Sequence, residues 1–270
     1  MTQATGKQYP IGLRYGAAFA LNSAGYPAAS SPTTPYEGVQ FVSADAFEMT
    51  IPDMRTIVHP GDDRVAAVDY LPTLDAVTGQ LTVSLYDLDL IALLTGVNVV
   101  DIGEMDSVSW FTDEQGAEPS IGLFFYQQSL NNSVKARNWR SMIVPSARCI
   151  PKTVGMVATQ TSMPYMIAVN PVSKQLWGTA LTAVTNGALE HGFVEFHSEQ
   201  KPWLANWLAN GTATVFSFSA SHQAYSTAKV TVFDNGTDVT GSVTVATTGV
   251  TFSPAPTSDH IISVWYEQAA

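Results

Sequence analysis

Short runs in which apolar and polar residues alternate recur along this chain, and Gly, Pro, Asn and Ser separate them. Such alternation is typical of half-buried strands, because successive side chains of a strand point to opposite faces of a sheet. It predicts strands at residues 11–21, 37–53, 81–85, 107–112, 121–128, 139–145, 154–161 and 165–170. Turn residues at this spacing favour a sandwich or barrel, so the predicted fold class is mainly β.

One helix is predicted to flank the sheet. In the run TGQLTVSLYDLDLIALLTGVN the spacing of apolar residues changes from two to between three and four after residue 87. Asp87 or Asp89 can cap the N-terminus of this helix with its carboxylate, and Gly96 ends it. A second short helix is predicted over residues 201–211, where Pro202 stands near the start and Gly211 past the end.

The composition changes at residue 211, and this change predicts two parts. Residues 1–211 are predicted to form one large β domain, and residues 212–270 a small all-β module with an Asn235-Gly236 turn. A module of this size rarely folds alone, so we expect it to rest on the first domain or on a neighbouring subunit. The Pro- and Ser-rich segment 22–36 is predicted as an exposed, adaptable loop, and Asp53–Val68 as a second long loop.

Charged residues are scarce, at 13% of 270 residues, and the net charge is −11. Low charge is typical of a chain that buries surface against neighbours. The acidic excess argues against a protein that grips nucleic acid through its phosphates. No signal peptide or membrane span is visible, so synthesis in the cytoplasm is expected. Cys149 is the single cysteine, and we interpret it as a buried apolar residue rather than a nucleophile.

The two signs of charge are also separated along the chain. Residues 41–120 hold 15 of the 23 acidic residues, whereas residues 119–189 hold none. The second stretch carries a basic block that consists of Lys135, Arg137, Arg140, Arg148, Lys152 and Lys174. We predict that the first five form an inter-subunit basic patch, which meets an acidic face of the next copy. The alternative is that the fold brings both stretches together and neutralises them within one chain.

Three groupings of residues invite a catalytic or metal-binding interpretation. They are His59 with Asp62 and Asp63, Asp87 with Asp89, and Glu195 with His197. A turn explains the first grouping. In the second grouping one carboxylate caps the helix and the other faces solvent, and in the third the two residues share one face of a strand. No motif for nucleophilic, nucleotide-binding or zinc-protease chemistry occurs in the chain. We therefore expect no enzymatic activity, no metal and no cofactor.

The passage T-G-x-L-x-V-x-x-x-D-L-D-L-x-A-L-L-T-G at Thr78–Gly96, with its early strand, long loop and returning strands, resembles the tail-tube (major tail) subunits of siphophages. The C-terminal run KVTVFDNGTDVTGSVTV resembles small β modules of phage virion proteins. The resemblance implies a β-sandwich or barrel with a flanking helix, and hexameric rings that stack into a tube for DNA ejection. It also implies a place in the virion tail and partners such as the tape measure and tail terminator proteins.

The same resemblance assigns two roles to parts of this chain. A loop at about Asp53–Val68 would bridge adjacent rings. DNA must pass through the bore without binding, so we predict a net acidic bore, with Asp45, Glu48, Asp87 and Asp106 as candidate lining residues. The alternative is a bore lined by Ser, Thr and Gln. Two other kinds of protein also fit the sequence. One is another phage structural component, such as a baseplate, tail-tip or head-decoration protein, and the other is an unrelated β-rich binding module.

Overall fold

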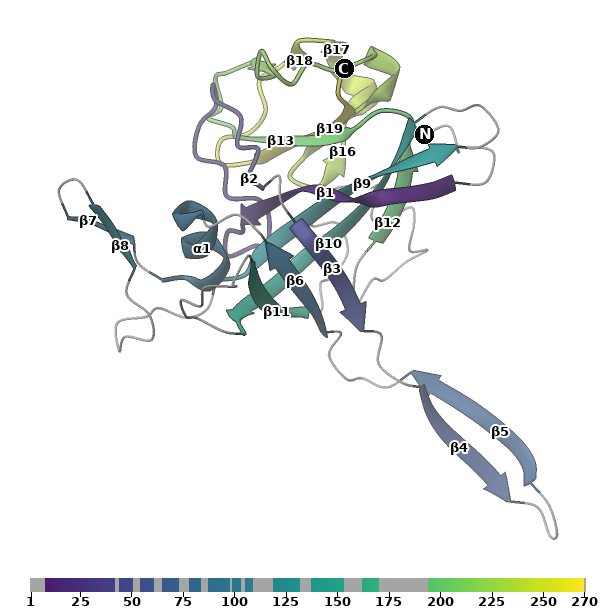
Figure 1. The fold of residues 1–270 in the computed structure, drawn as a ribbon. Coiled ribbons are helices and arrows are strands. Elements are labelled where there is room, and N and C mark those ends of the chain that lie inside the picture. Colours follow the sequence, from purple (N-terminus) through teal and green to yellow (C-terminus); the bar gives the residue numbers. More distant parts are fainter. Residues whose placement is uncertain are drawn as a thin grey trace.

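The computed structural model describes residues 8–41, 44–50, 54–60, 65–72, 78–83, 87–97, 99–102, 105–108, 119–131, 137–152, 162–169 and 194–269. Strands dominate these ranges, and α1 (Leu88–Thr95) is the one α-helix within them (Figure 1). The predicted mainly β fold with one helix is therefore confirmed. The strand predicted at residues 154–161 lies outside the described residues.

Eight strands form the largest sheet, and its neighbouring strands are antiparallel. Seven follow in the order β2 (Val39–Phe41), β1 (Gln8–Ala20), β9 (Ile121–Asn131), β10 (Arg137–Pro151), β11 (Met163–Val169), β6 (Thr78–Val83) and β3 (Ala44–Thr50). The eighth, β12 (Val194–Ser198), pairs with β10 beyond the end of β11. The sheet curls and brings distant strands together. The ring of Phe47 on β3 stacks on that of Phe125 on β9, with centroids 3.7 Å apart. We call this sheet together with α1 the body.

The inside of the curl is the core of the body. Alternate residues of the strands point into it, such as Leu123 and Phe125 of β9 and Cys149 of β10, and α1 contributes Leu90 and Leu94. Burial raises the pKa of the Cys149 thiol to about 12, because the thiolate would lose its hydration there. The interpretation of Cys149 as a buried apolar residue is confirmed.

The two ends of α1 follow from its sequence. The Asp87 carboxylate accepts hydrogen bonds from the backbone N–H groups of Asp89 and Leu90, at 3.0 and 3.3 Å. Gly96 has a φ of 71°, in the left-handed region, where a Cβ would also lie only 2.8 Å from the ring of Pro119. Both predicted helix ends are confirmed.

Residues 202–269 form a second unit, which we call the C-terminal unit. Its first sheet has the order β13 (Pro202–Leu208), β19 (Ile261–Glu267), β15 (Val230–Asp234) and β16 (Thr237–Asp238). Its second sheet has the order β14 (Val215–Ser217), β18 (Gly249–Thr251) and β17 (Thr244–Ala246). Side chains of both sheets, among them Trp207, Phe216 and Val264, share one core.

The helix predicted over residues 201–211 is wrong, because this segment is strand β13. It pairs with β19 along seven residues, from Pro202 to Leu208. Trp203 and Trp207 are four residues apart, a spacing that places two residues on one face of a helix and also on one face of a strand. Since β13 belongs to the sheet of the C-terminal unit, that unit begins before residue 211. The change of composition had placed the boundary between the two parts after residue 211.

Residues 22–38, between β1 and β2, form a strap along the free edge of β13. The backbone N–H groups of Tyr36 and Asn206 each donate to the carbonyl of the other, at 2.7 and 3.1 Å. Leu208 donates from its backbone N–H to the carbonyl of Ser31 at 3.1 Å. The strap covers an edge that would otherwise present unpaired backbone groups to other chains. The predicted exposed, adaptable loop is therefore a bound segment over much of its length.

The body and the C-terminal unit pack against each other through a third hydrophobic cluster, which we call the seam. Its members are Ala17, Phe19, Phe124, Tyr126 and Ile143 of the body with Leu204, Phe233 and Trp265 of the C-terminal unit. The rings of Phe124 and Trp265 meet edge to face, with centroids 5.3 Å apart. The C-terminal unit thus rests on the outer side of β1, β9 and the first half of β10.

Candidate assembly surfaces

The other outer side of the curled sheet is uncovered by the described residues, and we call it the open face. It crosses β10, β11, β6 and β3 in register, with exposed or half-buried side chains throughout. Its residues are Arg148 and Ile150 on β10, Pro164, Met166 and Ala168 on β11, Thr78, Gln80 and Thr82 on β6, and Ala46, Glu48 and Thr50 on β3. Ile150 and Met166 are direct cross-strand partners and are 41% and 52% exposed, unusual for large apolar side chains.

Alternation explains why this face is separate from the core. The residues between those of the open face, such as Ile167 on β11 and Leu81 on β6, point into the core of the body. Gly79 lets β6 and β3 approach, because a Cβ at this position would lie 2.5 Å from the carbonyl oxygen of Glu48 and 2.6 Å from the sulfur of Met49. The sequence thus sets one apolar and one mainly polar face on the same four strands.

A two-stranded ribbon of β4 (Met54–Pro60) and β5 (Val65–Pro72) extends away from the body beyond the ends of β3 and β6 (Figure 1). We call it the arm. Its seven paired positions span about 24 Å at ~3.4 Å per residue. The loop predicted for Asp53–Val68 is therefore wrong over most of its length. The Pro-Gly-Asp-Asp run at residues 60–63 is typical of a turn, and it obscures the strand pattern on either side.

The register of the arm divides its positions into two unlike sets. One face takes the uncharged positions Met54, Thr56, Val58, Val68, Tyr70 and Pro72. The other face takes Arg55, Ile57, His59, Ala67, Asp69 and Leu71. A two-stranded ribbon alone is marginal in water, so an arm of this kind needs another surface to pack on.

The candidate bore acids do not form one group in the structure. Glu48 is exposed on the open face, whereas Asp87 caps α1. Asp106 pairs with Asp101 in a second projecting ribbon, formed by β7 (Val99–Ile102) and β8 (Met105–Val108) (Figure 1). Asp45 stands at an irregularity in the register of β3, and its side chain lies outside the described residues.

Within the predicted basic patch, the described residues Arg140 and Arg148 do not share one face of the sheet. The register of β10 shifts between Val144 and Ala147, and this bulge reverses which face each later residue takes. Arg140 therefore points to the inner side, where it donates to Gln127 at 3.3 Å and lines a cavity of about 110 Å³ with Phe47. Arg148 instead lies on the open face, and Lys152 is exposed just after β10. The whole of Lys135 and Lys174, and the side chain of Arg137, lie outside the described residues.

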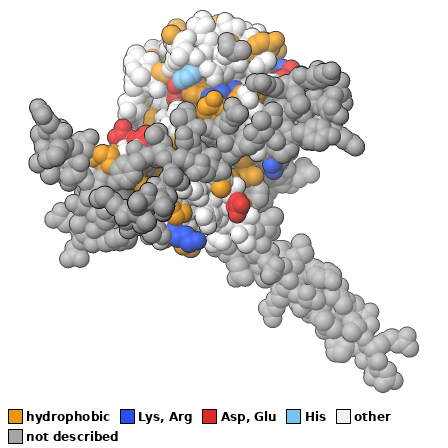
Figure 2. Space-filling view, in the orientation of Figure 1, with side chains coloured by type: hydrophobic (Ala, Val, Ile, Leu, Met, Phe, Trp, Pro, Cys, Tyr) orange, Lys and Arg blue, Asp and Glu red, His pale blue; other side chains and the backbone are white. Residues whose placement is uncertain are grey.

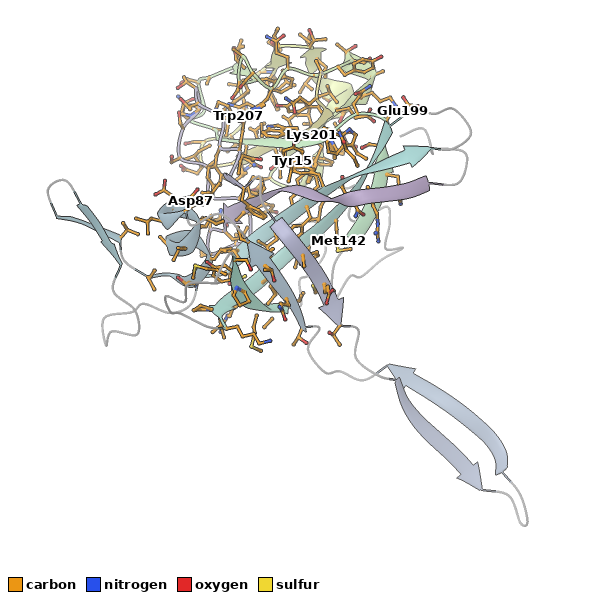
Figure 3. The ribbon with its side chains drawn as sticks, in the orientation of Figure 1. Tyr15, Asp87, Met142, Glu199, Lys201 and Trp207 are labelled. Atoms are coloured by element: carbon orange, nitrogen blue, oxygen red, sulfur yellow. The ribbon has the colours of Figure 1, made fainter. Side chains whose placement is uncertain are left out.

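An aromatic cage around Lys201 joins the two units at the seam, and no sequence pattern indicated it. The Lys201 ammonium lies 5.0, 5.1 and 4.4 Å from the ring centroids of Tyr15, Tyr126 and Trp203 (Figure 3 labels Lys201 and Tyr15). Burial lowers the pKa of Lys201 to about 8, although the charge of Glu37 acts in the opposite direction. Burial also raises the pKa of Tyr126 well above its usual range.

The lowered pKa of Lys201 predicts that stability increases with pH between about 8 and 9. The unfolded chain, with a lysine pKa of 10.5, binds more protons in this interval than the folded chain, so raising the pH favours folding. Above about pH 9 the unfolded chain also ionises Cys149, which offsets the effect of Lys201, and above about pH 10 it ionises tyrosines whose pKa values are raised in the folded state, so stability levels off and then decreases. Urea unfolding of the wild type and of Lys201→Met from pH 7 to 10 measures the effect. The variant should lack the increase, and identical profiles would contradict the assignment.

The groupings with a catalytic interpretation do not form a site among the described residues. Asp87 is occupied by helix capping, and His197 pairs with Arg140 in register across β12 and β10. His59 lies in the arm opposite Ala67, and Asp62 and Asp63 lie outside the described ranges. Within those ranges, no three His, Cys, Asp or Glu side chains gather so as to hold a metal ion.

Figure 2 shows few charged side chains among the described part of the surface. None of the described helices has the length and apolar character needed to cross a membrane. Comparison of the chain with protein-family models, with curated proteins and with solved structures finds no match in any of the three.

Proposed function

We propose that this chain is a virion structural protein whose copies form hexameric rings that stack into a phage tail tube. The open face carries the proposal. It is a sheet surface four strands wide with an uncharged centre, and the described residues of the same chain leave it uncovered. A ring of such faces supplies a continuous wall, which is what a conduit for DNA requires.

The two borders of the open face carry opposite charges. Arg148 lies on β10 and Glu48 on β3, both exposed. Three strand spacings, about 14 Å, separate these strands, so the two side chains cannot pair within one chain. Copies placed side by side bring the β3 border of one next to the β10 border of the next. This contact joins two different patches and is therefore heterologous. It closes into a ring when the rotation from one copy to the next is a whole fraction of a full turn.

The centre of the open face favours a neutral bore rather than a strongly acidic one. Between the charged borders stand Thr78, Gln80 and Thr82 of β6 and Pro164, Met166 and Ala168 of β11, none of which carries a charge. Phosphates are held chiefly by Lys and Arg, so a wall of this composition gives DNA little to bind. The proposal therefore takes the bore lined by Thr and Gln, with Glu48 and Arg148 neutralising each other between copies.

The arm supplies the contact between successive rings. It stands out from the end of the β3–β6 pair (Figure 1), and its register gives one of its faces only uncharged positions. Packing on a copy in the next ring would bury that face and stabilise a ribbon that is marginal alone. The position of the arm coincides with the segment to which the family resemblance assigns the bridge between rings.

Charge reversal across the copy-to-copy border tests the proposal. Glu48→Arg and Arg148→Glu each place like charges together, whereas the double variant restores an opposite pair. An exposed pair contributes about 0.2–1 kcal/mol, so six such contacts contribute roughly 1–6 kcal/mol for each ring. We expect each single variant to need a higher protein concentration for assembly and the double variant to return toward wild type. Negative-stain microscopy and sedimentation measure the rings and tubes.

Glu199→Arg is the matched control, because Glu199 is also exposed and lies away from the open face, with its carboxylate 4.0 Å from the Lys229 ammonium. Its assembly should equal that of the wild type. A double variant no better than either single variant would exclude the border contact. Wild-type trimers or discrete caps would instead favour a baseplate, tail-tip or decoration protein, and a dispersed monomer at high concentration would favour a binding module.

A further inference from the structure

The C-terminal unit contains two Asn-Gly pairs that are alike in several respects. Asn210-Gly211 follows β13, and Asn235-Gly236 forms the turn between β15 and β16. Both asparagines are exposed, and the two glycines have left-handed φ values of 76° and 80°. The pairs therefore share their sequence, their exposure and the conformation of the glycine. A third Asn-Gly pair, at residues 186–187, lies outside the described residues.

The two asparagine side chains differ in how they are held. The side-chain oxygen of Asn210 accepts hydrogen bonds from the backbone N–H and the hydroxyl of Thr212, at 3.0 and 3.1 Å, and from the backbone N–H of Ala213, at 2.7 Å. Within the described part of the chain, the side chain of Asn235 forms no hydrogen bond, and neither does the backbone N–H of Gly236. The amide of Asn235 can therefore turn toward the next backbone nitrogen, whereas that of Asn210 is fixed.

The turn that carries Asn235 also needs little energy to open. Its hairpin has only two paired positions, Phe233 with Asp238 and Asp234 with Thr237, and both residues of β16 are exposed. Among the described strands, β16 is the last one of its sheet. Short edge hairpins open locally at a fraction of the free energy of global unfolding. Opening frees the backbone of Asn235 from its left-handed conformation, at a φ of 47°, and lets it reach the geometry for ring closure.

We propose that Asn235 is a site of spontaneous deamidation, which loosens the hairpin of β15 and β16. The backbone nitrogen of Gly236 loses its proton and bonds to the side-chain carbonyl carbon of Asn235. The bond from that carbon to the amide nitrogen breaks, and ammonia leaves. Glycine permits this attack because no Cβ shields its nitrogen, and both reacting groups belong to one chain. Water then opens the five-membered imide at either carbonyl and leaves isoaspartate or aspartate at position 235. The reaction consumes one water and releases one ammonia, and nothing is oxidised or reduced.

Isoaspartate does not fit the turn that it would occupy. Hydrolysis at the backbone carbonyl routes the chain through the former side chain, which lengthens the backbone by one carbon and leaves a free carboxylate beside Asp234. A two-residue turn sets the register of its hairpin, so the added carbon disturbs the pairing of β15 with β16. The next bond of this hairpin joins the Val239 N–H to the carbonyl of Val232 at 2.9 Å. The inference concerns one chain and does not depend on whether copies assemble into a tube.

Peptide mapping of the full chain, aged in mildly alkaline buffer, tests the site. Each conversion replaces –NH2 by –OH, and mass spectrometry measures it separately in the peptides that contain Asn210 and Asn235. In the folded chain Asn235 should convert about tenfold or more faster than Asn210, because three hydrogen bonds hold the Asn210 side chain. In the chain unfolded by guanidinium chloride the two rates should be roughly equal, because both sites are Asn-Gly pairs. Roughly equal rates in the folded chain as well would overturn the proposal.

Hydrogen exchange tests the effect on the hairpin. In the isoaspartate form, separated by chromatography, the Val239 amide should exchange about tenfold or more faster, while the Val264 amide in the interior of the same unit stays protected. Asn235→Asp is the matched control, because it adds the same charge without the extra backbone carbon, and it should exchange as the wild type does. Unchanged exchange in the isoaspartate form, or an equal increase in Asn235→Asp, would refute loosening by isoaspartate.

Discussion

A chain that ends at residue 211 is expected to lose its folded state rather than to remain as a stable body. The truncation removes β19 and β15, so β13 keeps no partner strand from its own sheet. It also exposes the body side of the seam, including Phe19, Phe124 and Tyr126, at roughly 1.5–3 kcal/mol for each large side chain. The total approaches the 5–15 kcal/mol that stabilises a typical domain. Solubility, and the presence of a cooperative thermal transition, measure the outcome.

Point variants in the full chain separate the seam from other effects of truncation. Trp265→Ala removes a buried ring from the seam and should lower the free energy of unfolding by about 3–5 kcal/mol. Val215→Ala, in the same unit but 55% exposed, should change it by less than about 0.5 kcal/mol. A soluble truncated chain that melts cooperatively would show instead that residues 1–211 fold without the rest of the C-terminal unit.

Features that depend on a few neighbouring residues were predictable from the sequence. The helix α1 with its Asp87 cap and Gly96 end is one, because capping and the left-handed glycine act within a single turn. The mainly β fold is another, because strand alternation is repeated many times along the chain. The burial of Cys149 followed in the same way from the apolar run around it.

Features that depend on distant parts of the chain were not predictable. The spacing of Trp203 and Trp207 fits a helix and a strand equally, and only the pairing with β19 decides between them. The hydrogen bonds that turn a Pro-rich loop into the strap join residues about 170 positions apart, such as Asn206 and Tyr36. The Lys201 cage likewise draws its rings from three strands.

The candidate site was only partly predictable, because one irregularity can rearrange a surface. The basic block in the sequence is continuous, yet the bulge in β10 sends Arg140 inward and leaves Arg148 outward. Among the candidate bore acids, Glu48 reaches the open face because it lies on a strand with regular alternation from Ala46 onward. A β-bulge of a single residue has no clear signature in composition or charge, so which face each residue takes beyond it is settled by pairing.

Replacing residues 51–77 by the dipeptide Asn-Gly is expected to abolish tube formation while the chain stays folded. Thr50, the last residue of β3, pairs with Thr78, the first residue of β6, so a two-residue type I′ turn can join these strands directly. The shortened chain keeps the body core, the seam and the open face, because none of their described residues lies between 51 and 77. If the arm connects successive rings, single rings should still form but should not stack. Microscopy and sedimentation distinguish separate rings from tubes.

Variants of the intact arm keep this prediction testable if the shortened chain folds poorly. Val58→Asp puts a charge at a position on the uncharged face of the arm, where packing on a neighbouring ring would bury it without a partner. Ile57→Asp is the matched control, because the adjacent position lies on the face that already includes Arg55, His59 and Asp69. A buried unpaired charge costs several kcal/mol at each contact, so Val58→Asp should block stacking whereas Ile57→Asp should reduce it much less. Tubes of normal length from both the shortened chain and Val58→Asp would show that the arm does not connect the rings.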